Sequence, residues 1–206
     1  MTTKQTTKTK SVLVPEVNYS EVQIPIRGLT TLLTNQIADI AMRNIEAKGK
    51  KTVKEVDDRS DEERCQDALY EVDVAAPENE GRYGMPGGAF RKAMVSVCRN
   101  KDASGGINMS QARQMFQIMD DIVPIYCRQM RMRVDKGRNK LTGLVRIIRP
   151  EFVEWTATLN IRYNADVVSA DQIVNLVQMS GSDVGVGCWR PECSGNRGMF
   201  SVVTGK

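Results

Sequence analysis

The chain has 206 residues and a formal net charge of +4, with 41% apolar and 26% charged residues. These values are close to the averages of soluble globular proteins, and no stretch reaches the roughly 18 apolar residues that a membrane span requires. They exclude a wholly disordered chain and a membrane protein. Five widely spread cysteines without a secretory signal indicate reduced thiols, so we expect a cytoplasmic protein.

We expect the chain to consist of a mobile basic tail, residues 1–16, and one domain over residues 17–206. Tyr19–Gly28 alternates apolar and polar residues, which is typical of a half-buried strand. In Thr30–Ala47 the apolar residues return at spacings of three and four, which predicts a helix. Residues 48–70 are then expected to form an insertion.

The acidic run Glu55–Arg64 lies within this insertion. Ser60 and Glu63 have the spacing of a capping box, which predicts that a helix begins there. Acidic residues at a helix start are favoured by the helix dipole. We therefore assign no metal to these acids, nor any cofactor to the chain.

The centre of the chain combines a glycine pair with basic residues. Tyr70 to Val74 alternates like a short strand, and a helix is predicted over Ala89–Arg99. Gly87 and Gly88 directly before this helix would let a phosphate approach free backbone N–H groups, with Arg91 and Lys92 beside it. A plain turn between strand and helix is the alternative.

A second insertion, residues 100–142, is predicted to hold a short helix and the start of a strongly basic segment, Arg128–Arg149. This segment contains eight basic residues and one acidic residue, which gives a local charge of +7. Alternation predicts a strand with arginines on one face and Met130, Met132 and Val134 on the other. A hairpin tip is predicted at Lys136–Lys140. The expected nucleic-acid contacts are Arg128, Arg131, Arg133, Lys136, Arg138 and Lys140.

The last third predicts two strands, 144–150 and 152–164, then a helix and a final strand. Ser169 and Gln172 form a second capping box, and Gly181 is the expected end of that helix. Strand, helix and strand in this order form half of a ferredoxin-like sheet. We therefore predict an α+β fold, in which a four-stranded, ferredoxin-like (RRM-like) antiparallel sheet carries helices on one face.

A glycine-rich run, "GVGCWRPECSGNRGMF" from Gly185 to Phe200, joins that helix to the last strand. Glycines allow close approach of a phosphodiester, arginines neutralise it, and an indole offers a stacking face. Alternatively, the tryptophan is a core or interface anchor, and an ion pair between Arg190 and Glu192 fixes the loop. The expected contacts are Gly185, Gly187, Trp189, Arg190 and Arg197.

"MPGGAFRKAM", Met85 to Met94, and the C-terminal glycine-rich run together resemble motifs of the RAMP superfamily, the backbone subunits of CRISPR effector complexes. The C-terminal run is also similar to uncharacterised proteins of tailed bacteriophages. The first resemblance implies a nucleic-acid-binding fold that often oligomerises along a strand, and sometimes an endoribonuclease. The second implies a bacterial host cell.

We expect a non-catalytic protein that binds single-stranded RNA or DNA and assembles side by side as an oligomer or filament. The chain has no histidine, which removes the commonest general base and makes an enzyme the weaker expectation. Two alternatives stay open. One is a phage structural or assembly protein whose basic strip contacts protein, and the other is a metal-dependent nuclease using Asp120, Asp121 or the acids near Asp57.

Overall fold

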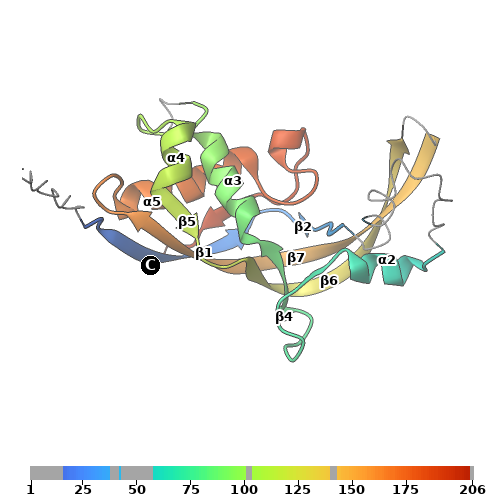
Figure 1. The fold of residues 1–206 in the computed structure, drawn as a ribbon. Helices are drawn as coiled ribbons and strands as arrows, with labels where there is room; N and C mark the ends of the chain where they lie inside the picture. The colour runs from blue at the N-terminus through green and yellow to red at the C-terminus, as the bar shows by residue number, and fades with distance from the viewer. Residues whose placement is uncertain (1–15, 38–41, 43–57, 101–103, 140–142, 205–206) are drawn as a thin grey trace, which may run out of the picture.

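The computed structural model describes residues 16–37, 42, 58–100, 104–139 and 143–204, and Figure 1 shows their arrangement. One antiparallel sheet of eight strands forms the base, with the order β3-β4-β6-β7-β1-β8 along its main path, while β2 and β5 pair with β7. The strands are β1 Tyr19–Gly28, β2 Leu32–Leu33, β3 Tyr70–Glu71, β4 Glu80–Pro86, β5 Phe116–Ile118, β6 Ile122–Asn139, β7 Gly143–Asn164 and β8 Phe200–Val202.

Three helices cover one face of this sheet: α3 Gly87–Val97, α4 Met109–Met115 and α5 Ala170–Met179 (Figure 1). A fourth helix, α2 Asp61–Asp67, lies beside the extended part of β6 and β7. The core forms where the helices meet the sheet. There Phe200 packs edge-on against Phe90 and Trp155, with ring centroids 5.8 and 6.1 Å apart. The predicted α+β class is confirmed, and the sheet has eight strands in place of the four expected.

The central pair, β6 and β7, extends beyond the helix layer as a long two-stranded ribbon (Figure 1). Pairing runs from Tyr126 opposite Thr156 to Asn139 opposite Gly143. The hairpin tip predicted at Lys136–Lys140 is therefore wrong for residues 136–139, which lie inside the ladder. The two strands predicted at 144–150 and 152–164 are one continuous strand, whose Glu154 has a left-handed backbone with φ of 52°.

The helix predicted over Thr30–Ala47 is also wrong at its start. Leu32 and Leu33 are extended and fully buried as β2, which pairs with Phe152 and Glu151 of β7. Burial of two neighbouring residues against a strand overrides the helical spacing of the apolar residues. Most of the remainder of that range, and residues 1–15 of the expected tail, lie outside the described residues.

The predicted strand from Tyr70 to Val74 ends at Glu71 in β3. Val72 and Val74 are exposed, and the backbone N–H groups of Val72 and Asp73 both donate to the carbonyl of Arg82. The chain therefore turns here before it enters β4.

Two of the predicted helix starts are confirmed. Ser60 and Glu63 form the capping box of α2, and Ser169 and Gln172 form that of α5. The predicted end at Gly181 is wrong, because α5 continues into a π turn, Ser180–Val184, and the backbone turns away only at Gly185, with φ of 68°. No helix in the described part of the chain is long and apolar enough to cross a membrane.

Candidate nucleic-acid interface

The C-terminal loop, Gly185–Met199, is held in place by its own backbone and by β2. Val186 and Gly198 are bonded N to O at 2.9 Å, and the N–H of Cys188 donates to the carbonyl of Leu33 at 2.9 Å. Gly187 has φ of 76°, and a Cβ built there would lie 2.4 Å from the Leu33 carbonyl oxygen. Gly187 thus lets the loop pack against β2, while the predicted approach of a phosphate to it stays a prediction.

A buried carboxylate, Glu151 of β7, organises the basic side chains under this loop. Its side chain is 1% exposed and accepts from Arg131 Nε at 2.8 Å and Arg133 Nη1 at 3.4 Å, and from Thr31 Oγ1 at 2.7 Å. Arg197 reaches it from the C-terminal loop at 3.5 Å. Burial raises the pKa of Glu151, but these hydrogen bonds and positive charges outweigh it and hold the pKa below its ordinary value.

Trp189 lies over the same cluster. Its ring centroid is 6.0 Å from the guanidinium of Arg133 and 5.9 Å from that of Arg149, and the side chain is 40% exposed. Two guanidinium nitrogens of Arg149, Nε and Nη1, are buried without a hydrogen-bond partner. Trp189 is therefore not a core residue but a half-exposed ring beside two cations.

We define the arginine cluster as Trp189, its four arginines and two carboxylates. Arg133 is also bonded to Asp135 at 3.0 Å, and this partner raises the pKa of Arg133. Four guanidinium groups meet two carboxylates, which leaves two positive charges. The arginines are Arg131, Arg133, Arg149 and Arg197, and the carboxylates are Asp135 and Glu151.

Other charges of the basic segment are also paired. Exposed Arg128 bonds Glu154 at 3.0 Å, and Arg146 bonds Asp61 of α2 at 2.5 Å. The basic segment thus contacts the acidic run Glu55–Arg64 within one chain at Asp61, whereas residues 55–57 lie outside the described residues. Three acids outside the segment, Asp61, Glu151 and Glu154, thus reduce its local charge from +7 to +4.

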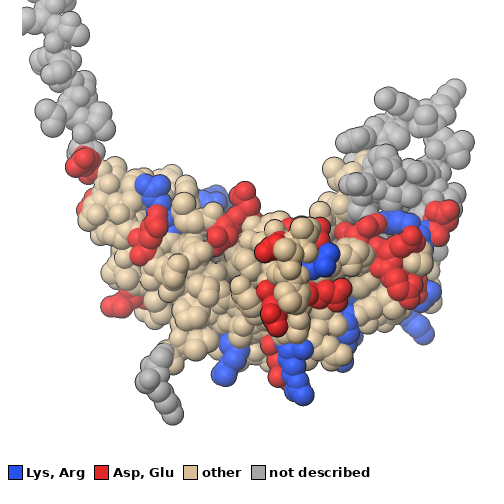
Figure 2. Space-filling model, turned by 90° about the horizontal axis from the view of Figure 1, so that it is seen from below, with Lys and Arg blue, Asp and Glu red and all other residues tan. Residues whose placement is uncertain are grey.

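The remaining members of the predicted basic strip differ in their surroundings. Lys136 is exposed on β6, the side chain of Arg138 is not described, and Lys140 lies outside the described residues. The expected apolar face of this strand is not buried along the ribbon, because Met132 and Val134 are exposed. On the face opposite α3–α5, which Figure 2 shows, basic and acidic side chains are mixed.

The glycine pair before α3 is part of the helix. The Gly87 N–H donates to the Asp121 carbonyl at 2.8 Å, so it is not free for a phosphate as predicted, and a Cβ at Gly87 would lie 2.1 Å from the Asp120 carbonyl oxygen. Arg91 donates to the carbonyls of Arg113 and Phe116 and thereby ties α3 to α4 and β5. Of the residues predicted to contact a phosphate here, Gly88 and Lys92 are exposed, Arg91 is half-buried and Gly87 is buried.

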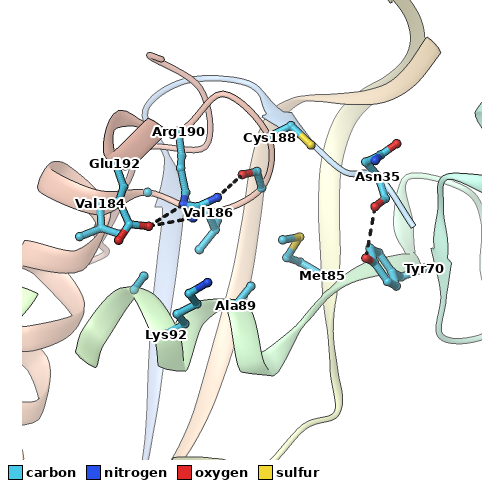
Figure 3. A pocket seen from close by; sticks show the side chains of 13 residues that line it. Asn35, Tyr70, Met85, Ala89, Lys92, Val184, Val186, Cys188, Arg190 and Glu192 are labelled. Atoms are coloured by element: carbon cyan, nitrogen blue, oxygen red, sulfur yellow. Dashed lines mark hydrogen bonds and ion pairs between the residues drawn. The ribbon is translucent and has the colours of Figure 1, made fainter. Parts of the chain in front are cut away.

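A pocket of about 210 Å³ lies between α3 and the C-terminal loop, and it brings the two glycine-rich segments together (Figure 3). Lys92 lines it from α3, and Gly185, Gly187 and Arg190 line it from the loop. Arg190 is bonded to Glu192 at 2.8 Å, which confirms the ion pair considered as a fixing contact of this loop. Hydrogen bonds from Arg190 and Ser96 lower the pKa of Glu192.

Neither Glu151 nor Arg149 is among the contacts predicted from the sequence. Residues 149 and 151 share a face if one strand runs through Pro150, so alternation could have indicated them, but the sequence predicts two strands that are separated at this point. Among the described residues, no group of three or more acidic or cysteine side chains is placed to hold a metal ion. Asp120 instead accepts from Asn160 at 2.8 Å.

No protein-family model matches the sequence, and no curated protein matches it either. Among solved structures, the fold is similar to that described as "Crystal structure of Cmr6 from Pyrococcus furiosus", with a TM-score of 0.41 and 7% sequence identity. The similarity covers 91% of this chain and 100% of that chain. A likeness of this size carries no argument about the activity of the present chain.

Proposed function

We propose that the chain is a non-catalytic protein that binds single-stranded nucleic acid, RNA or DNA, at the arginine cluster and the C-terminal loop. The observation that supports this most directly is the Trp189 ring, which is 40% exposed and whose centroid lies about 6 Å from the guanidinium groups of both Arg133 and Arg149. Proteins that hold single strands combine aromatic faces for the bases with positive charge for the backbone.

The electrostatics of the cluster support an anionic partner. Glu151 and Asp135 fix Arg131 and Arg133 in place, so little side-chain freedom is left to lose on binding. Two positive charges remain uncompensated. A phosphodiester next to a stacked base supplies the negative charge.

Side-by-side assembly is part of the proposal. The β6–β7 ribbon extends beyond the helix layer and exposes Met132, Val134 and Leu144, the last with 74% of its surface accessible. Exposed apolar side chains near one another favour a protein contact. They also favour the alternative of an assembly protein, which differs from the main proposal in having no affinity for oligonucleotides.

Trp189→Ala tests the nucleic-acid proposal. We expect it to weaken binding of a labelled single-stranded oligonucleotide by about 1–3 kcal/mol, because a stacking face is lost, while the thermal midpoint changes little. Tyr126→Ala is the matched control, since Tyr126 is exposed and no arginine among the described residues lies over its ring.

The parent protein's affinity is measured over a salt series in the same experiment. We expect log K to fall with log salt at about 0.7 per single-strand phosphate contact. Absence of salt-dependent oligonucleotide binding by the parent would overturn the proposed function and leave the assembly alternative.

A further inference from the structure

The pocket between α3 and the C-terminal loop contains a cation that no described residue neutralises. Lys92 rises from α3 into the pocket (Figure 3), and within the described residues it has neither a hydrogen bond nor an ion pair. Arg190 on the opposite wall is fully engaged, because Glu192 accepts from it and it donates to the Gly187 carbonyl at 3.2 Å. The pocket therefore offers one positive charge to a ligand.

The other walls are apolar and suit a flat group. Met85 and Ala89 line one side, and Val184 and Val186 line the side of the loop. A methionine sulfur packs well against aromatic rings. At about 210 Å³ the pocket is smaller than the roughly 300–1,000 Å³ of sites for drug-sized ligands, so it fits a single ring system better than a whole coenzyme.

Polar groups close the far end of the pocket. The Tyr70 hydroxyl lies 3.5 Å from the backbone carbonyl oxygen of Asn35 (Figure 3), and Cys188 lines the same pocket. Burial raises the pKa of both Tyr70 and Cys188, so these groups stay protonated at neutral pH. A hydroxyl and a carbonyl oxygen at the end of an apolar slot can pair with the polar edge of a heterocycle.

A second groove adjoins this pocket and shares Lys92 and Glu192 with it. It has a volume of about 310 Å³ and runs between α3 and α4, where Arg91, Arg99 and Arg113 line it. Positive charge thus continues from Lys92 along the helices, which suits a chain of phosphates better than one isolated anion.

We propose that this pocket receives one nucleobase of the bound strand, unstacked from its neighbours, with Lys92 on the adjoining phosphate. The inference rests on the proposed function and adds a second subsite on the other side of the C-terminal loop from Trp189. The apolar walls receive the ring, Tyr70 and Asn35 face its polar edge, and the α3–α4 groove takes the backbone onward.

The test uses oligonucleotides that contain one 2-aminopurine, whose fluorescence rises when the base leaves the stack. We expect the parent protein to raise this fluorescence on binding. Ala89→Leu fills the pocket without changing charge and should abolish most of the rise. Lys92→Gln should weaken affinity about tenfold and reduce the salt slope by about 0.7. Arg27→Gln removes one exposed charge on β1, a residue that lines neither the pocket nor the groove and is not a predicted contact, and is the matched control.

Thermal melts establish that each variant is folded. The inference is overturned if folded Ala89→Leu and Lys92→Gln bind and fluoresce like the parent while Trp189→Ala weakens binding, a result that leaves the proposed function intact. Failure of the parent to bind any oligonucleotide contradicts both. A free mononucleotide is titrated in parallel, and tighter binding of it than of the strand, lost in Ala89→Leu, would replace the strand subsite by a nucleotide site.

Discussion

Two basic regions lie on either side of the C-terminal loop, and they differ in whether their charges are paired with carboxylates. In the arginine cluster, Arg131, Arg133 and Arg197 all converge on Glu151. In the pocket, Lys92 faces the loop without a partner among the described residues. The number of basic residues in a segment therefore does not measure the charge that it offers to a ligand.

The difference has a physical cause. Glu151 is buried by β2, the C-terminal loop and the ribbon, and a buried carboxylate is stable only when it is paired and hydrogen-bonded. An ammonium group at the mouth of a pocket keeps its water and needs no partner. The cluster is thus first a structural contact whose excess charge is left for a ligand, whereas the charge of Lys92 is available in full.

Glu151→Gln should have the largest effect, and it tests whether the arginine cluster is held together by a structural ion pair. The variant removes the charge on which three arginines converge, and we expect a loss of about 3 kcal/mol of unfolding free energy. That is the lower end of the range for a broken buried ion pair, because the arginines retain contact with water.

Urea unfolding measures this loss, and Glu154→Gln is the control. Glu154 is exposed and pairs with exposed Arg128, so its loss should cost at most about 1 kcal/mol. Equal losses in the two variants would show that Glu151 does not hold the cluster together.

Gly187→Ala should have an intermediate effect and shows whether the loop serves both regions. The left-handed backbone costs about 1–2 kcal/mol with a side chain, and the new Cβ must also move away from Leu33. Gly105→Ala is the control, because Gly105 also has a left-handed backbone, with φ of 66°, but nothing lies within 4 Å of its Cβ position.

Oligonucleotide affinity is measured with both glycine variants. In Gly187→Ala a displaced loop should weaken the binding through Trp189 and through the pocket together, whereas Gly105→Ala should bind like the parent. An unchanged melting temperature for Gly187→Ala would show that the close contact with β2 does not fix the loop.

The smallest effect is expected from pH. The pKa of Glu151 is lowered in the folded chain, so its contribution to stability is present above the unfolded value of about 4.3 and is lost as pH falls through the folded pKa. Burial raises the pKa of Glu151 and so opposes the lowering by its hydrogen bonds, which keeps the net contribution to stability small. We expect the stability difference between the parent and Glu151→Gln to narrow in urea titrations below about pH 4. A difference that grows on acidification would reverse the sign of this linkage.

The sequence by itself determined the features that depend on neighbouring residues. The capping boxes at Ser60 and Ser169, the alternation of β1 and the apolar face of α3 were predicted correctly, because caps and periodicity act within one or two turns of chain. Trp189 and three of the four arginines near it, Arg131, Arg133 and Arg197, are also among the contacts predicted from the sequence. These signals are local, and tertiary contacts did not override them.

Only the tertiary structure decided which charges are paired and which segments share a sheet. The helical spacing at Leu32 and Leu33 gave way to pairing with β7, and one strand runs through the point where two were predicted. Arg131 and Arg197 meet at Glu151 although they lie far apart in the sequence. Such contacts depend on strand register and on burial in the assembled fold, and no local pattern encodes them.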